Sequence, residues 1–203
     1  MDGLVNDSDG FSLKETAALA GLSERTLRNE VDRGIVRPRK VARGRRCDLR
    51  LPAEAILYFM LVRETPFALA RKDRAHLYRL LVDRDKRHGA WTSSGNALKS
   101  GIVTIDAAAP RRRLAERLRI YRRGLGRLAR SPEILGGEPV FAGTRIAIRH
   151  VGRLALRGVE AAEILADFPA LTDDDVAFAR IYAGMKPAPG RPRKRLRFRA
   201  AGA

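Results

Sequence analysis

The chain has 203 residues, of which 45% are hydrophobic, and it carries a formal net charge of +18 at pH 7. This length and apolar content suffice for one or two folded domains, so the composition excludes an intrinsically disordered chain. The single cysteine, Cys47, excludes an internal disulfide framework. Because no signal-peptide pattern and no apolar run long enough to span a bilayer is present, we expect a cytoplasmic protein without a membrane partner.

Most of the excess positive charge lies in two segments. Residues 111–130 contain nine arginines and one glutamate, and residues 186–203 contain seven basic side chains and no acidic one. Charge concentrated in this way is typical of a chain that contacts a polyanion or an acidic protein surface. The alternative, which stays open at this point, is that these arginines cover solvated faces without a ligand.

Two short helices are predicted near the start of the chain, after a polar segment at residues 1–10. Ser12 and Glu15 form a capping-box pattern, and Gly21 ends the helix that they begin. Ser23 caps a second helix, which ends at Gly34. Two helices joined by a short glycine-containing turn are typical of a helix-turn-helix, whose second helix enters the major groove of DNA.

The second of these helices has one face suited to contact with DNA. If Leu22, Leu27 and Val31 face the core, the opposite face carries side chains that can reach base edges and phosphates. Arginine and asparagine can each bind a base edge with two hydrogen bonds. The DNA-contacting residues predicted on this helix are Arg25, Thr26, Arg28 and Asn29.

A basic β-hairpin with its turn at Gly44 is predicted next. Its arginines suit the phosphate backbone, and the predicted DNA-contacting set therefore also includes Arg43, Arg45 and Arg46. The run L-K-E-T-A-A-L-A-G-L-S-E-R-T-L-R-N-E-V resembles the MerR group. This resemblance implies a winged helix-turn-helix DNA-binding domain over residues 1–64. The alternative is a helical pair that only packs against the core.

Residues 65–130 are predicted to form a linking or dimerisation region. A helix from Ala53 to Glu64 is indicated just before it and packs against the wing. A linker or dimerisation helix is indicated from Phe67 to Lys86, and in both helices apolar residues recur at intervals of three and four. Residues 89–96 are rich in serine and glycine and predict a loop. The β-branched residues between Leu98 and Asp106 predict a single strand.

The arginine-rich segment predicts a helix that begins near Pro110. Apolar residues such as Leu114 and Leu118 recur along one side, and the arginines lie elsewhere on the cylinder. Two interpretations stay open, a second contact with the DNA backbone or a helix packed between two domains. We favour the packed helix, with its arginines solvated or touching phosphates. Gly124 and Gly126 are expected to weaken its end.

Residues 131–150, which read S-P-E-I-L-G-G-E-P-V-F-A-G-T-R-I-A-I-R-H, predict a tight β-hairpin around Gly143. After the hairpin the apolar pattern changes from period two to period 3.6 and indicates three helices, at residues 151–156, 162–168 and 176–182. Residues 131–185 therefore predict a small domain with a β-hairpin and three helices.

This C-terminal segment also resembles a known family. The run just quoted, followed by G-V-E-A-A-E-I-L-A-D-F-P-A-L-T-D-D-D-V, is similar to the domain of unknown function 433 family. The resemblance implies a small antitoxin-type domain, as in the VapB family of antitoxins. It also implies a partner, a PIN-domain ribonuclease toxin of the VapC type.

The sequence predicts no catalytic or metal-binding group. The run from Thr172 to Asp175 is explained by an N-cap followed by carboxylates that favour the helix dipole. The three histidines, His76, His88 and His150, are scattered, and none pairs with a cysteine or an acid at ligand spacing. We therefore expect a protein that is not an enzyme and that uses neither a metal nor a cofactor.

The basic tail at residues 186–203 is rich in proline and charge, and it is predicted to be disordered until it binds a partner. In the first interpretation its arginines neutralise the metal-binding carboxylates of a PIN-type toxin, and its two apolar residues fill adjacent pockets. The residues predicted to bind the toxin are Arg191, Arg193, Arg195, Leu196, Arg197 and Phe198. The other interpretations are an AT-hook-like contact of G-R-P-R-K with the minor groove, and non-specific solvated charge.

Together these patterns predict a mainly α fold with small β elements, in which a winged helix-turn-helix precedes a C-terminal β-hairpin and three-helix domain. The leading hypothesis is the antitoxin of a type II toxin-antitoxin module. Such a protein represses its own promoter as a homodimer and neutralises a PIN-domain ribonuclease. The alternatives are a free-standing DNA-binding transcriptional regulator without a toxin partner, and an RNA-binding protein.

Overall fold

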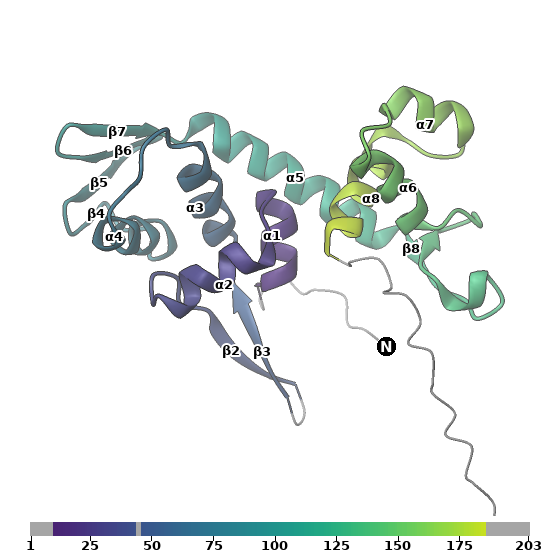
Figure 1. Ribbon diagram of the computed structural model, residues 1–203, viewed down its shortest axis with the longest axis horizontal. Helices are drawn as coiled ribbons and strands as arrows, with labels where there is room; N and C mark the ends of the chain where they lie inside the picture. Colours follow the sequence, from purple (N-terminus) through teal and green to yellow (C-terminus); the bar gives the residue numbers. More distant parts are fainter. Residues whose placement is uncertain (1–9, 44–45, 186–203) are drawn as a thin grey trace, which may run out of the picture.

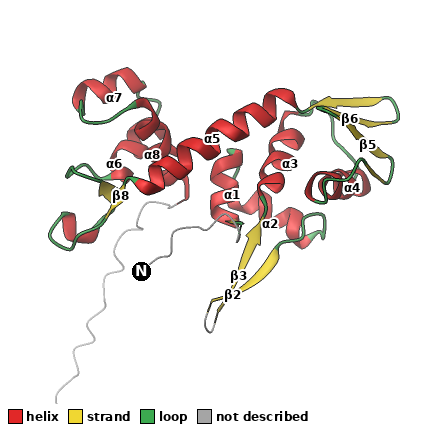
Figure 2. Ribbon diagram, turned by 180° about the vertical axis from the view of Figure 1, so that it is seen from behind, coloured by secondary structure: helices red, strands yellow, loops and turns green. Residues whose placement is uncertain are grey.

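The computed structural model describes residues 10–43 and 46–185. Figure 1 shows a long helix, α5 (Ala108–Gly126), that runs from the N-terminal helices and a small sheet to three shorter helices at the other end of the molecule. Figure 2 shows the same arrangement from behind, with the strands confined to small sheets. The predicted fold class, mainly α with small β elements, is confirmed.

The first part of the chain forms two short helices, a three-stranded antiparallel sheet and a longer helix. Ser12 caps the first helix, and the Glu15 carboxylate accepts a hydrogen bond from the Ser12 backbone N–H, so the predicted capping box is present. Gly21 ends this helix in the left-handed conformation, with φ of 70°. The elements are β1 (Phe11–Ser12), α1 (Leu13–Ala20), α2 (Glu24–Asp32), β2 (Arg39–Arg43), β3 (Arg46–Leu51) and α3 (Ala53–Glu64). The strands pair in the order β1-β3-β2.

A second sheet follows α4 (Arg71–Val82), and it corrects the prediction for this region. Its four antiparallel strands, in the order β4-β5-β6-β7, are β4 (Arg87–His88), β5 (Trp91–Ser94), β6 (Ala97–Ser100) and β7 (Val103–Asp106). The predicted loop at residues 89–96 and the predicted single strand at residues 98–106 are therefore both wrong. Gly95 and Gly101 have φ of 59° and 57° and form tight turns between short strands. Trp91 is buried in β5, which packs against α4, so this serine-rich stretch has a hydrophobic anchor.

The packed-helix interpretation of the arginine-rich segment is confirmed. One side of α5 is buried, and the helix packs against α1, α3 and α8 (Asp173–Met185). Gly124 lies on this side, where a Cβ atom would come within 2.0 Å of the Phe178 ring. The prediction treated this glycine only as a weak point, whereas its missing side chain lets α5 and α8 approach.

The C-terminal part contains the predicted helices but not the full predicted hairpin. The helices are α6 (Ile148–Leu156), α7 (Ala161–Asp167) and α8, and a short 3₁₀ turn η2 (Leu135–Gly137) precedes strand β9 (Val140–Phe141). Gly143, with φ of 77°, does form a turn, but only a single bridge, from Val140 to Ala147, follows it. The second strand is missing because α6 already begins at the buried Ile148. β9 pairs instead with β8 (Leu128–Ala129), directly after α5.

A close contact between α6 and α8 holds the C-terminal helices together. A Cβ atom on Gly152 would lie 2.2 Å from the carbonyl oxygen of Ala179 and 2.6 Å from the Cβ of Ala183. Only glycine leaves room for the α8 backbone at this point.

The hydrophobic core is continuous along the molecule. An aromatic chain crosses from the N-terminal strand to α8, with ring centroids 6.4 Å apart for Phe11 and Tyr121, 6.2 Å for Tyr121 and Phe178, and 5.7 Å for Phe178 and Tyr182. Pairs at these separations add attraction beyond the area that they bury. Within the described residues, no helix combines the length and the apolar character needed to traverse a bilayer.

Candidate nucleic-acid interface

The turn between α1 and α2 fixes how the second helix is presented. The Leu22 N–H donates to the Ala17 carbonyl at 2.9 Å, and the Ser23 hydroxyl accepts a hydrogen bond from the Thr26 N–H at 3.1 Å. On the inner side of α2, Leu27 and Glu30 are buried. The helix therefore begins at a defined residue and has one face that is fixed against the core.

The outer face of α2 carries the residues predicted to contact DNA, and all four are exposed. Within the described chain, the side chains of Arg25 and Asn29 make no hydrogen bond or ion pair. The Arg28 guanidinium donates to Glu24 at 2.6 and 3.1 Å, and the Thr26 hydroxyl lies 2.9 Å from that of Ser23. An exposed ion pair at this helical spacing contributes only about 0.5 kcal/mol, so Arg28 can exchange Glu24 for another partner at little cost. The exposed residues are Arg25, Thr26, Arg28 and Asn29.

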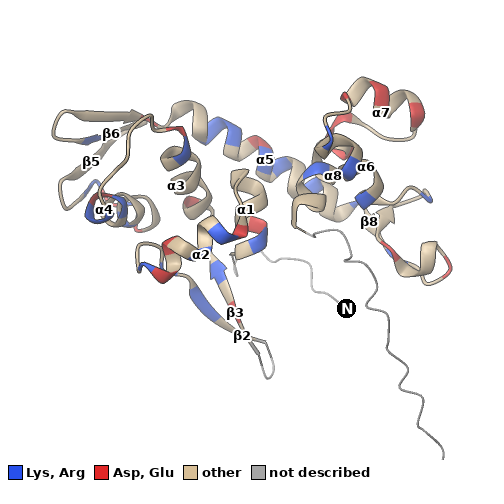
Figure 3. Cartoon of the chain, in the orientation of Figure 1, with Lys and Arg blue, Asp and Glu red and all other residues tan. Residues whose placement is uncertain are grey.

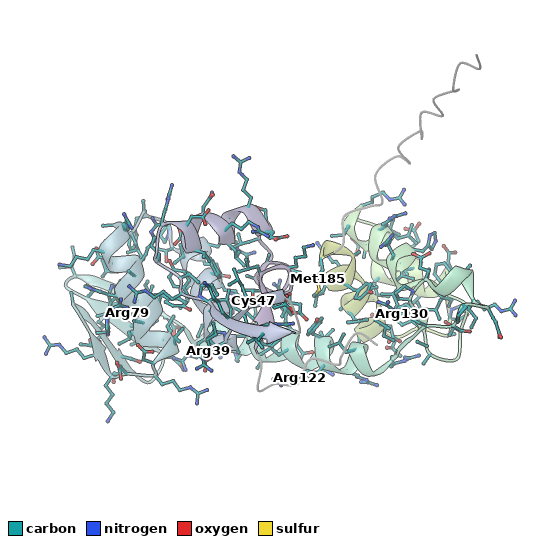
Figure 4. The ribbon with its side chains drawn as sticks, turned by 90° about the horizontal axis from the view of Figure 1, so that it is seen from below. Arg39, Cys47, Arg79, Arg122, Arg130 and Met185 are labelled. Carbon is teal, nitrogen blue, oxygen red and sulfur yellow. The ribbon has the colours of Figure 1, made fainter. Side chains whose placement is uncertain are left out.

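The β2–β3 hairpin extends beyond α2 in both ribbon views (Figures 1 and 2). Arg39 and Lys40 of β2 are exposed, and the charge view shows basic residues along this strand (Figure 3). The backbones of Arg43 and Arg46 lie opposite each other at the end of the β2–β3 ladder. The predicted Arg45 lies outside the described residues. Viewed from below, Arg39 and the exposed Cys47 lie on this hairpin (Figure 4).

A buried polar cluster joins the base of the hairpin to α1 and α5. The Glu15 carboxylate accepts hydrogen bonds from the Tyr121 hydroxyl at 2.7 Å and from the Arg50 guanidinium at 3.3 Å. Burial and the adjacent Glu15 carboxylate raise the pKa of Tyr121 well above its ordinary value, so the hydroxyl stays protonated and donates. The hairpin is thereby tied to the long helix that reaches the C-terminal part.

A second buried cluster fixes α2 against α3 and α4, and the sequence analysis did not identify it. Glu30 accepts hydrogen bonds from Tyr58 of α3 at 2.9 Å and from Arg74 of α4 at 2.5 Å. Arg71 of α4 also donates to the carbonyl of Arg33, just after α2. The signal in the sequence is the position of Glu30, which lies three residues after the buried Leu27 on the inner face of α2.

Three arginines of α5, Arg113, Arg119 and Arg123, bind carboxylates of the chain, which was not predicted, and their side chains remain exposed to solvent, as expected. Arg119 donates both to Glu116 and, at 2.9 Å twice, to Asp174 of α8. Arg123 also binds Asp174, and Arg113 pairs with Glu64 of α3. Hydrogen bonds from Arg119 and the charge of Arg123 lower the pKa of Asp174.

The start of α8 has the predicted cap, and two of its aspartates also bind arginines near α5. The Thr172 hydroxyl accepts from the Asp175 N–H, and the Asp175 carboxylate accepts from the Thr172 N–H, so the predicted cap is present. Asp175 also binds Arg127 at 2.5 Å, and Asp174 holds the two α5 arginines. These carboxylates therefore join α8 to α5.

The expectation that no histidine lies beside an acid at ligand spacing is wrong. Atoms of Asp83, Asp85 and His88 that could act as ligands lie within 4.8 Å of one another. The His76 ring packs on that of His88, with centroids 5.4 Å apart. The turn between α4 and β4 brings these residues together, and a turn at Arg84, with φ of 55°, is not evident from sequence spacing.

The residues predicted to bind a toxin lie outside the described residues, because all belong to the segment 186–203. They are Arg191, Arg193, Arg195, Leu196, Arg197 and Phe198.

Comparison with known proteins identifies the C-terminal part. Residues 129–183 match the family described as "Protein of unknown function (DUF433)", so a DUF433 domain is present there and this predicted resemblance is confirmed. Over 92 residues the chain is 34% identical to "Uncharacterized protein y4eO" of Sinorhizobium fredii, a match that covers 45% of this chain and 42% of that protein. The chain thus spans less than half the length of this relative. No solved structure matches the chain.

Proposed function

We propose that the chain binds duplex DNA as a winged helix-turn-helix protein, with α2 in the major groove and the β2–β3 hairpin along the neighbouring phosphates. The observation that carries this proposal is the outer face of α2. There Arg25 and Asn29 are exposed without partners in the described chain, while the opposite face of the helix is buried.

Two groups of side chains have separate roles in this proposal. Arg25 and Asn29 contact base edges, where arginine pairs with guanine and asparagine with adenine, and they supply sequence preference. Arg39 and Lys40 contact phosphates, and they supply affinity that depends on salt but not on sequence. The clusters around Glu15 and Glu30 hold the hairpin and α2 in place for both contacts.

The test is fluorescence anisotropy with duplex DNA from the promoter region upstream of the coding sequence. Arg25→Ala and Asn29→Ala should each weaken binding to this duplex by about 1 to 3 kcal/mol. The matched control is Arg112→Ala, because Arg112 is also exposed, lies on α5 and is far along the chain from α2. If the α2 variants bind as tightly as the control, α2 is not the reading helix.

We further propose that this DNA-binding protein is an antitoxin that dimerises on its promoter and neutralises a PIN-domain ribonuclease. Two features support the proposal: the resemblance of the C-terminal segment to antitoxin-type domains, and the arginine-rich composition of residues 186–203. Guanidinium groups can pair with the carboxylates that hold a metal ion in such a ribonuclease. The alternative function is a free-standing transcriptional regulator.

Co-expression with the product of the adjacent reading frame separates these two functions. An antitoxin should co-purify with that product as a stable complex on size exclusion, and deletion of residues 186–203 should release ribonuclease activity. A chain that elutes alone and still binds its promoter supports the free-standing regulator.

A further inference from the structure

A groove of about 860 Å³ lies between the N-terminal helices and the C-terminal helices. Residues of α1 and α5 and the end of α3 line one side, and residues from the end of α6 to the start of α7, together with α8, line the other. Its apolar wall includes Leu22, Ile120, Val176 and the half-exposed Leu156. The volume falls within the range of sites that hold small molecules.

Three arginines converge on this groove from three different helices. Arg63 donates to the carbonyls of Ala20 and Gly21 at 3.0 and 3.2 Å, and Arg117 donates to the Leu19 carbonyl at 2.6 Å. These bonds satisfy the carbonyls at the end of α1 and fix both guanidinium groups at the groove. A second nitrogen of Arg63 also donates to Glu64 at 3.5 Å. Because a guanidinium has five N–H donors, both side chains keep donors for a ligand.

The third arginine, Arg180 of α8, faces the same groove and is exposed. Within the described residues its side chain makes no hydrogen bond or ion pair. Burial and the charges of Arg63, Arg113 and Arg180 lower the pKa of Arg117, and Glu64 is the carboxylate that opposes them. Glu64 pairs with Arg113 and also with Arg63, and Glu160 and Asp173 are the acidic residues that line the groove. Within the described residues, Arg117 and Arg180 have no carboxylate bound to them, so their charge is available to a ligand.

We propose that this groove is a binding site for a small organic anion with an apolar body. The anionic group is held by Arg63, Arg117 and Arg180, and the apolar part lies against Ile120 and Leu156. Charge-assisted hydrogen bonds to guanidinium groups are the strongest that a neutral-pH site offers to a carboxylate, sulfonate or phosphate. The site does not depend on the proposed DNA binding.

The test uses 8-anilinonaphthalene-1-sulfonate, which combines a sulfonate with an aromatic body and becomes fluorescent in apolar surroundings. With the full-length chain we expect a saturable rise in fluorescence with one site per chain. Arg180→Gln should weaken binding roughly tenfold, because one charge-assisted hydrogen bond is lost. Arg180 has no partner in the described chain, so the substitution leaves the fold intact, which circular dichroism checks.

The matched control is Arg112→Gln, which removes the same charge from an exposed position of α5 outside the groove. It should bind the dye like the unchanged chain. The proposal would be overturned if the dye did not bind saturably, or if Arg180→Gln bound it as tightly as the unchanged chain. An equal loss of affinity in both variants would also overturn it, because that result indicates attraction by net charge alone.

Discussion

The buried carboxylate of Glu30 joins α2 to α3 and α4. Glu30 is 7% exposed and accepts hydrogen bonds from Tyr58 and Arg74, which belong to two other helices. A buried ion pair contributes little to net stability, but removal of one partner is costly, because the remaining charge stays buried without compensation.

Substitution of Glu30 by Gln should therefore lower the free energy of unfolding by about 3 kcal/mol, since Arg74 would lose its counter-charge. Urea denaturation measures this change. Asp32→Asn is the control, because Asp32 is exposed on the same helix and should shift the free energy by less than about 0.5 kcal/mol. Equal effects of the two substitutions would show that Glu30 does not anchor α2.

At the scale of elements, α5 joins the two ends of the molecule through close packing and through ion pairs. Its approach to α8 depends on Gly124, where a Cβ atom would meet the buried Phe178 ring. Nearby, Arg119 and Arg123 bind Asp174 at the start of α8. Both contacts are between residues far apart in the sequence.

Gly124→Ala should destabilise the chain by about 1 to 3 kcal/mol, because the new methyl group must displace Phe178 in a filled core. Gly126→Ala, two residues later on the same helix, has no atom within 4 Å of its Cβ position and should be neutral or stabilising by up to about 1 kcal/mol. Thermal unfolding followed by circular dichroism compares the two. A melting temperature that falls equally in both would contradict the proposed packing.

The Asp174 contact should make stability depend on pH. Arg119 and Arg123 hold the pKa of Asp174 below its ordinary value of 3.8. Because the pKa of Asp174 is lower in the folded state than in the unfolded state, its ionised carboxylate stabilises the fold. This contribution to the free energy of unfolding is complete above about pH 5 and is lost as the pH falls through the pKa of the folded state. The difference in unfolding free energy between the unchanged chain and Asp174→Asn should be constant from pH 7 to 5 and shrink below pH 4. A difference that persists unchanged to pH 2 would exclude this ion pair.

Features encoded by neighbouring residues could be predicted from the sequence, and features made by distant residues could not. Ser12 with Glu15, Ser23 and Gly21 lie within a few residues of the helix ends that they define, and the predicted helices begin and end there. The second sheet was missed because Trp91, which anchors it beside α4, lies in a serine- and glycine-rich stretch.

The same distinction between neighbouring and distant residues holds for the candidate nucleic-acid interface. The exposure of the four predicted residues on α2 follows from helical periodicity, and the structure confirms it. The cluster around Glu30 was missed because Tyr58 and Arg74 are 28 and 44 residues away in the chain. The acidic partners of the α5 arginines were missed for the same reason, since Asp174 lies 55 residues from Arg119.

At the scale of the whole molecule, three of the seven arginines of α5, namely Arg113, Arg119 and Arg123, are paired with Glu64, Glu116 and Asp174. The charge that remains exposed near α2 and the hairpin includes Arg25, Arg39 and Lys40. The proposal assigns the DNA contact to these groups and not to α5.

This distribution predicts how affinity for DNA depends on salt. Each phosphate neutralised by a basic side chain contributes about −0.9 to the slope of log K against log salt concentration. Substitution of Lys40 by Ala should reduce the slope by about one and weaken all duplexes alike, whereas Arg112→Ala should leave the slope unchanged. Anisotropy titrations at several salt concentrations measure this, and a slope altered only by Arg112→Ala would move the contact to α5.

The most direct test of the proposed DNA binding is a competition experiment on duplexes selected by the full-length chain from a randomised pool. The account predicts that an enriched duplex competes at least about 10³-fold better than a scrambled duplex of equal length at physiological salt. It also predicts that this preference collapses in the Arg25→Ala, Asn29→Ala double variant. Equal competition by the two duplexes, or a preference that survives the double substitution, would contradict it.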